Sequence, residues 1–453
     1  MKKIIVSLWA ISLVLSIATS SFAATHKRKH HYSQTGSNTS LQQQVSDLKQ
    51  NQKTLEKKVD DQGEYIEKQK GNWSNKFEGG WKKGLYFQTA DGKYSTKFRV
   101  RIQPQYSYTS ASKIKEGKDD QSTFRIRRAK VSWEGNLFSK NLDYKFQLNA
   151  AVSNWQDVLE DAYVNYKVID PFRIQFGQEK VQYNRQELNS SGRLELVDRS
   201  LAADAFRFST VDSTTNTVCT LPGGGTVTGS GITCGAGATT TTTTTNTPRQ
   251  FHFDTGLIFW GTAFNRKMEY YAGIMNGTGP NRLDTNNRFL YTGRLVGNIL
   301  GDYGYSESDV EYSEHPSLTI GASGGYKKQE VTNAALYQEG AELGFKYKGA
   351  SLQGEFYARQ TNSQGAAATT KDYGYYVQAG YFVLPRHLEL AARASQVFLA
   401  GANNNKAEYM GGINYYFLGH DLKIQTDFSY LKNETTKGVA NDFRARAQLQ
   451  AWF

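Results

Sequence analysis

Apolar and polar residues alternate one by one along most of the chain from Trp73 onward. In the last stretch, Ala445 and Leu449 fall on one side of the pattern, whereas Arg444 and Arg446 fall on the other. Successive residues of a β-strand point to opposite faces, so this alternation predicts strands with one apolar and one polar face. The alternating segments run about 10–15 residues, which is long for strands of a soluble sandwich.

The polar positions of these segments are mostly cationic: seventeen Lys and Arg residues stand against seven Asp and Glu. Such a face is consistent with a soluble sheet facing water or with the wet interior of a barrel. The barrel is favoured by long strands without helices to cover a sheet, by aromatic residues near the segment ends, and by connections that alternate short and long. In a bilayer, only helices and closed barrels satisfy every backbone group.

Counting strands backwards from Phe453 supports a closed barrel. Tight turns such as Leu418–Asp421 alternate with longer loops, of which residues 181–249 form much the longest. Leu300–His315 is the one long connection on the short-turn side. The tally is sixteen strands beginning near Tyr94, and an even number with short periplasmic turns is typical of bacterial outer-membrane barrels. The predicted fold class is all-β: a 16-stranded antiparallel transmembrane β-barrel with apolar side chains facing lipid.

One strand requires an irregularity. Strict alternation through Phe124–Glu134 would aim Arg128 and Lys130 at lipid, at a cost of about 2–4 kcal/mol each. A β-bulge near Arg127 and Arg128 would turn both arginines inward and leave Ala129 on the lipid side. With that bulge, the predicted pore-lining cations are Arg99, Arg101, Arg125, Arg127, Arg128, Lys145, Arg173, Arg288, Arg294, Arg444 and Arg446.

Several of these segments in series resemble a known family. The order FRVRIQPQYSY, TFRIRRAKVSWEGNL, DYKFQLNAA, LEDAYVNYK, FRIQFGQEKV and ELNSSGRLELVDRSLAADAF is similar to the phosphate-selective porins O and P, most clearly over about residues 80–210. The resemblance implies a sixteen-stranded porin in outer-membrane lipid, usually a homotrimer. It also implies that the third long loop folds into the lumen as the constriction.

The third long loop in the strand count is residues 181–249, in agreement with that expectation. Its first part carries charges of both signs: Arg185, Glu187, Arg193, Glu195, Asp198 and Arg199. Inside a narrow lumen, these charges would create a transverse field opposite walls rich in Arg and Lys. Alternatively, they form salt bridges that pin the loop to the wall, and the sequence leaves both roles open.

The second part of that loop, about residues 210–247, departs from the family pattern and is interpreted as an insertion. It contains seven consecutive threonines at 239–245 and the two cysteines of the chain, Cys219 and Cys234. In an oxidising compartment, a disulfide between them would staple the loop and contribute about 3 kcal/mol. The composition offers little to pack, which favours a surface excursion over a pore plug.

The N-terminal residues predict export. Lys2 and Lys3 precede the apolar segment Ile4–Ala18, and Ser21 and Ala23 suit a cleavage site, so residues 1–23 are predicted to be a cleaved signal peptide. The apolar segment is too short for an ordinary spanning helix, and mean hydropathy over the chain is −0.60. These features exclude a conventional helical membrane protein.

Three further zones follow the signal peptide. Residues 24–40 are basic and polar and are predicted to be flexible. Residues 41–70 carry about four heptads, which predict a short periplasmic coiled coil or, alternatively, a lone amphipathic helix packed on something else. Residues 73–453 are the predicted barrel domain. The coiled coil implies a periplasmic partner or self-association, and its oligomeric state stays open.

A wet, cationic lumen predicts diffusion rather than bond chemistry. The chain has a formal net charge of +12 at pH 7, and an exported protein rarely meets nucleic acid, so this charge must be explained by something outside the cytoplasm. The excess of cations at the lumen-facing positions predicts a preference for anions. The predicted function is a channel for ions and small anionic or neutral hydrophilic solutes, with a modest anion preference. The alternatives are a phosphate- or polyphosphate-selective channel and a non-conducting barrel that acts as a surface adhesin or envelope tether.

An enzyme is not expected. The barrel region holds four histidines, each near a strand start or connection, and no convincing nucleophile–base pair or metal-ligand cluster is apparent. They are His252, His315, His387 and His420. No catalytic residue, metal or cofactor is predicted.

Overall fold

The computed structural model describes residues 43, 46, 49–64, 77–112, 119–284, 287–330, 332–363 and 369–453. The chain divides into two compact units, Met1–Asn75 and Lys76–Phe453. In the first unit, residues 49–64 form a helix whose side chains are exposed. Among the residues that the structure describes, no helix combines the length and the apolarity needed to cross a membrane. The predicted signal peptide, the basic segment and, apart from residues 43 and 46, the rest of the predicted coiled coil lie outside the described residues.

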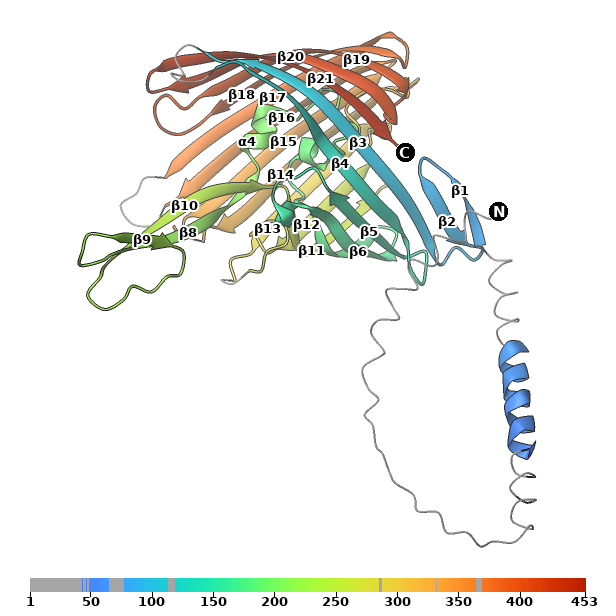
Figure 1. Cartoon of the computed structure of the whole chain (residues 1–453). Coiled ribbons are helices and arrows are strands. Elements are labelled where there is room, and N and C mark those ends of the chain that lie inside the picture. The colour runs from blue at the N-terminus through green and yellow to red at the C-terminus, as the bar shows by residue number, and fades with distance from the viewer. Residues whose placement is uncertain are drawn as a thin grey trace. The chain divides into compact units, whose positions relative to one another are not determined.

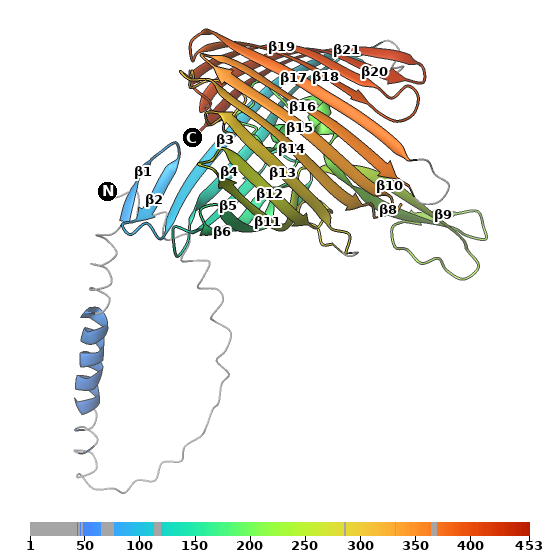
Figure 2. The same ribbon diagram turned by 180° about the vertical axis from the view of Figure 1, so that it is seen from behind.

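The second unit is built on a closed antiparallel barrel of sixteen strands (Figures 1 and 2). Each strand pairs with its neighbours in the barrel order, and β21 pairs with β3 to close the cylinder. The strands are β3 (Ser95–Ser110), β4 (Gln121–Asn136), β5 (Leu142–Asn149), β6 (Leu159–Ile169), β7 (Phe172–Lys180), β11 (Phe253–Ala263), β12 (Met268–Met275), β13 (Leu290–Leu300), β14 (Ser317–Lys328), β15 (Ala335–Tyr347), β16 (Ala350–Asn362), β17 (Thr370–Leu384), β18 (Leu388–Phe398), β19 (Lys406–Leu418), β20 (Leu422–Thr435) and β21 (Gly438–Trp452). The predicted strand number is confirmed.

The two faces of the wall differ as the alternation requires. In the pairing of β18 with β19, Glu389 lies opposite Asn414, and both side chains are fully buried on the inner face. The neighbouring pair, Leu390 and Ile413, is 46% and 49% exposed on the outer face. The apolar residues therefore cover the outside of the cylinder, where lipid would contact them.

The predicted bulge is present in β4. Gln103 of β3 pairs with Arg128, whereas the next residue, Pro104, pairs with Ile126, so Arg127 is the extra residue. Arg128 and the alternate residues after it consequently point into the lumen. The neighbouring proline fits this position, because a residue without a backbone N–H is tolerated at bulges.

A second irregularity lies in β6. Gln147 of β5 pairs with Asp161 and Leu148 pairs with Leu159, so Glu160 is an extra residue. Glu160 and Asp161 are both buried on the inner face, although they are consecutive. Strict alternation would place only one of these two neighbours inward, so the lumen contains more acidic groups than the alternation predicts.

Two elements lie outside the barrel. A hairpin of β1 (Phe77–Trp81) and β2 (Leu85–Thr89) pairs through β2 with the start of β3. At the opposite end of the barrel, a separate sheet extends outward (Figure 1). This sheet, here named the tongue, comprises β8 (Phe208–Thr220), β9 (Thr226–Gly229) and β10 (Thr239–Phe251).

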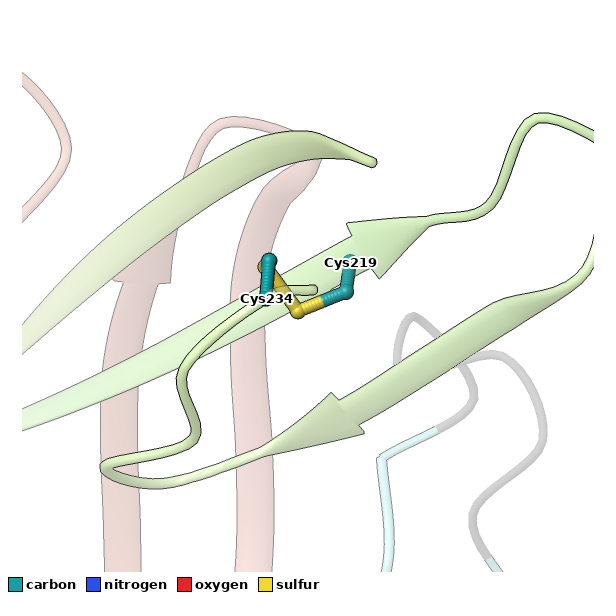
Figure 3. The surroundings of a disulfide bond; sticks show 2 residues. All are labelled: Cys219 and Cys234. Atoms are coloured by element: carbon teal, nitrogen blue, oxygen red, sulfur yellow. A yellow bond between two sulfur atoms is a disulfide. The ribbon is translucent and has the colours of Figure 1, made fainter. Parts of the chain in front are cut away.

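The tongue occupies the region interpreted as an insertion. Cys219 on β8 and Cys234 on the segment after β9 are joined by a disulfide (Figure 3). Most of β10 is exposed, which matches a surface excursion rather than a pore plug.

Candidate functional site

The lumen contains a folded segment between β7 and the tongue, residues 181–207, here named the constriction loop. It forms two short helices, α3 (Arg185–Leu188) and α4 (Leu201–Ala205). Asn184 and Ser200 cap them by accepting backbone N–H groups at 3.1 Å, which satisfies donors that a helix start leaves free. Most of the loop is buried, and α4 lies within the barrel in Figure 1.

The outer part of the constriction loop packs by apolar contact. Phe206 is fully buried and stacks on Tyr357 of β16 with ring centroids 5.4 Å apart. Inward-facing glycines make room for the loop: a Cβ atom added at Gly374 would lie 2.5 Å from the Phe206 ring. At Gly380 it would lie 1.9 Å from the Glu195 carboxylate. The alternation of polar inward residues is therefore interrupted where the loop sits.

An ion-pair cluster anchors the start of the loop to the wall. Arg185 contacts Glu342 of β15 at 2.8 Å, and Arg294 of β13 contacts the same carboxylate at 2.8 Å. The backbone N–H groups of Arg185 and Gln186 also donate to Glu355 of β16, each at 2.8 Å. These contacts tie Arg185 and the start of the constriction loop to the wall.

At the opposite wall, three arginines contact the carboxylate of Asp198, a residue of the constriction loop. Its carboxylate lies 2.9 Å from Arg128, 2.9 Å from Arg446 and 3.1 Å from Arg127. Burial by itself would raise the pKa of Asp198, but these cations outweigh burial and hold that pKa well below its usual range. The β4 bulge is essential to this arrangement, because it directs both Arg127 and Arg128 at one carboxylate.

A third cluster lies within the loop. Glu187 contacts Arg199 at 3.1 Å and Arg207 at 2.6 Å. Arg199 also donates to the backbone carbonyls of Gln186 and Asn189. These contacts hold the loop in its folded shape.

The long connection between β13 and β14, residues 301–316, here named the inner turn, enters the lumen from the other end. Arg185 donates to the carbonyl of Gly304 at 2.7 Å. The Glu307 carboxylate accepts from the Gln186 side chain at 3.0 Å and from the Glu195 backbone N–H at 2.8 Å. The constriction loop and the inner turn therefore meet inside the barrel.

Glu195 is buried at this meeting point. Its carboxylate accepts from Ser351 at 2.5 Å and from Gln378 at 2.7 Å. Burial, together with the nearby Glu389 and Glu307 carboxylates, raises the pKa of this loop residue well above its usual range. The contacts with Ser351 and Gln378 tie Glu195 of the constriction loop to β16 and β17 of the wall.

The other predicted cations face inward or lie at the rim, and each contacts a partner. Arg99 contacts Asp421, Arg101 contacts Ser190 and Ser191, Arg125 contacts Gln105, Lys145 contacts Asp161, Arg173 lies over Trp260, Arg288 donates to the carbonyls of Gln329 and Glu330, and Arg444 contacts Glu408. Arg193 of the constriction loop is exposed and lines a cavity of about 470 Å³ beside the inner turn.

A second cavity of about 270 Å³, here named the outer cavity, lies on the tongue side of the constriction loop. Seven of its lining residues are cationic: Arg127, Arg128, Lys130, Lys180, Arg199, Arg207 and Arg249. Asp157 and Glu160 are its acidic lining residues. Lys130 forms an ion pair with Glu160, whereas Lys180 donates to backbone carbonyls at 2.8 and 3.1 Å.

Sequence reasoning missed parts of this site. Lys180 is the last residue of β7, and Arg207 is the last residue of the constriction loop, so neither stands at an alternating position inside a strand. Glu160 points inward only because of the β6 bulge. The inner turn was recognised as unusually long, and its length was the available signal that it enters the lumen. In the described part of the chain, no group of three or more His, Cys, Asp or Glu residues is placed to hold a metal ion.

A closed antiparallel barrel with an apolar outer face and a charged interior defines an outer-membrane channel protein. Residues 98–250 and 316–453, well over half of the chain, match the family described as phosphate-selective porin O and P. The chain belongs to this family, and its fold and family place it in the bacterial outer membrane.

Solved structures share the fold at low sequence identity. The anion-selective porin from Comamonas acidovorans is 11% identical with a TM-score of 0.50, over 80% of this chain and all of that one. The outer-membrane channel DcaP of Acinetobacter baumannii is 12% identical with a TM-score of 0.50, over 81% of this chain and 99% of that one. An uncharacterized protein of Aquifex aeolicus is 24% identical over 121 residues, and the match covers 23% of this chain and 29% of that protein.

Proposed function

We propose that the chain forms a water-filled diffusion channel for ions and small hydrophilic solutes, with a modest preference for anions. The observation that carries this proposal is the cation surplus at the outer cavity. Seven cationic side chains line it, and five acids oppose them: the lining Asp157 and Glu160, and the loop residues Glu187, Asp198 and Asp204. The net positive charge would raise the local concentration of anions.

Further support comes from lumen cations that contact neutral groups. Arg101 and Arg125 donate to serine and glutamine side chains, whereas Lys180, Lys346 and Lys423 donate to backbone carbonyls. In the part of the chain that the structure describes, none of these five forms an ion pair with a carboxylate. Several moderate cationic sites suit conduction, because one deep site would hold an anion too tightly.

The test is a reversal potential in a planar bilayer. Purified protein is inserted between two KCl solutions of different concentration, and the sign of the zero-current potential reports which ion crosses faster. We expect the sign of zero-current potential that results when chloride crosses the channel faster than potassium. A cation-selective potential contradicts the preference but leaves the channel intact. Absence of single-channel steps favours instead the non-conducting surface adhesin or envelope tether.

A phosphate- or polyphosphate-selective channel is a second candidate. The outer cavity favours it, since Lys180, Arg199 and Arg207 lie together there with Arg128, and guanidinium groups suit phosphate oxygens. Phosphate added to a chloride-conducting channel should then lower the chloride current at concentrations where sulfate has less effect. Equal effects of both anions would support general anion preference.

For the assembly, we propose a homotrimer in the outer membrane, with residues 41–70 as a coiled coil in the periplasm after removal of residues 1–23. The described helix at 49–64 agrees with this proposal, because Leu55 and Val59 lie exposed on it, 61% and 64%, and would gain from a partner. N-terminal sequencing of the mature protein tests the cleavage site. Chemical crosslinking with and without residues 41–70 tests whether this segment contributes to the trimer.

A further inference from the structure

The tongue has two sheet edges of different character. Its strands lie in the order β10, β8, β9, so β10 forms one edge and β9 the other. β9 has four residues, and the disulfide between Cys219 and Cys234 fastens the segment that follows it to β8. β10 is thirteen residues long, and its first ten residues are exposed. One edge is therefore short and covalently tied, and the other is long and open.

The open edge lacks the features that usually block pairing with another strand. Natural edge strands are protected by charges, prolines, bulges or very short length. Thr239–Thr245 has none of these, and its pairing with β8 runs without a register shift. Pro248 and Arg249 lie only near the base, where Arg249 binds Asp157. β-branched threonine favours extended backbone, so the edge is already shaped to pair.

The chemistry of this edge suits a second copy of the same chain. Residues 213–248 carry no Asp, Glu, Lys or Arg, although the whole chain has a formal net charge of +12. Two copies can therefore approach through the tongue without like-charge repulsion. A run of seven threonines also reads the same in both directions, so in an antiparallel pair every threonine lies opposite another threonine, a favourable cross-strand pair.

We propose that Thr239–Thr245 of β10 pairs antiparallel with the same edge of a second copy of this chain. Such a pair has a twofold axis, so it joins two barrels and cannot join three around a common axis. The tongue would therefore connect one porin assembly to the next in the membrane, independently of conduction and of the contacts that form the assembly itself. The tongue extends beyond the barrel wall, where such a contact is sterically accessible (Figure 1).

The test compares full-length proteins in detergent by light scattering over a range of concentrations. The wild type should reach at least twice the mass of its basic assembly as concentration rises. The double variant Thr241→Lys/Thr243→Lys places like charges across the proposed pair and should require at least tenfold higher concentration. Thr226→Lys/Thr228→Lys adds the same charges to β9 and should behave as wild type, as should Thr241→Val/Thr243→Val, which keeps the β-branched shape.

Hydrogen exchange then tests the geometry. Backbone pairing should slow amide exchange in residues 239–245 at concentrations where the wild type doubles in mass. The proposal is overturned if the wild type shows no concentration-dependent doubling, if both lysine variants associate equally well, or if doubling leaves these amides unprotected. The last result would indicate contact through side chains rather than through the strand edge.

Discussion

At the scale of single residues, Asp198 is the group whose charge should most directly set selectivity. It offsets one of the three positive charges of Arg127, Arg128 and Arg446, which face the lumen around it. Asp198→Asn keeps the acceptor oxygen but removes the negative charge. At about 7 Å in a water-like medium, one charge changes an ion's energy by about 0.6 kcal/mol. Removing the negative charge favours chloride and disfavours potassium by this amount each, so the chloride-to-potassium permeability ratio should rise about sevenfold. Reversal potentials measure this ratio.

The matched control is Asp170→Asn in the turn between β6 and β7. Asp170 also contacts a cation, Lys167, but its side chain is 88% exposed. Water and salt screen such a pair, so selectivity should not change. A smaller anion preference in Asp198→Asn than in wild type would show that the neighbouring arginines do not act on the permeating ions.

Glu195 leads to a prediction about pH. Its pKa is raised in the folded protein by burial and by nearby carboxylates, above about 4.3 in an unfolded chain. The folded state thus binds more protons, and stability decreases as pH rises from the unfolded pKa toward the folded one. Glu195→Gln removes this contribution to the free energy of unfolding, so its heat-unfolding midpoint should fall less than that of the wild type as the pH rises from about 4.3. The exposed Glu78→Gln should retain the wild-type dependence.

The direction of a side chain could be predicted from the sequence where the opposite direction would place its charge in lipid. Arg128 and Lys130 had to avoid lipid, and that requirement located the β4 bulge before its partners were known. Glu160 gave no comparable signal, because Asp161 beside it already supplied an inward acid and Glu160 lies near a strand end. A pattern based on strict alternation therefore missed the Lys130–Glu160 ion pair.

At the scale of elements, the β4 bulge predicts that one residue of this strand can be deleted while the barrel still assembles. Removing the extra residue Arg127 restores regular alternation and leaves Arg125, Arg128 and Lys130 pointing inward. We expect this deletion variant to form a heat-resistant barrel in outer membranes, seen as a gel-mobility shift on heating. Removing Ala129 instead forces either Arg128 or Lys130 toward lipid, at a cost of about 2–4 kcal/mol. Equal assembly of the two variants would contradict the bulge.

Loop length and charge predicted one inserted element but not the other. The constriction loop was expected inside because it belongs to the longest connection and because the family resemblance implies it. The inner turn has sixteen residues between Leu300 and Ser317. Its partners, Arg185 and Gln186, lie more than a hundred residues away in sequence, so local patterning could not locate their contact.

At the scale of the whole molecule, two long insertions, the inner turn and the tongue, lie at opposite ends of the barrel and should affect conduction differently. The inner turn contacts the constriction loop through Gly304 and Glu307. Replacing residues 302–315 by a short glycine-rich turn removes material from the lumen and frees that side of the loop. We expect a larger single-channel conductance and a weaker anion preference, because a wider water-filled path screens the wall charges from passing ions.

Removing residues 214–245 of the tongue is the matched control for the inner-turn variant, because it deletes an even longer segment from the opposite, outer end of the barrel. The Asp212–Arg282 ion pair at the tongue base and the buried Phe208 remain, so the constriction loop should keep its position. Single-channel conductance and reversal potential should then equal those of the wild type. Deleting the tongue could instead enlarge the conductance as much as deleting the inner turn does. That result would place the narrowest part of the path at the tongue. It would contradict a limiting constriction where the constriction loop meets the inner turn.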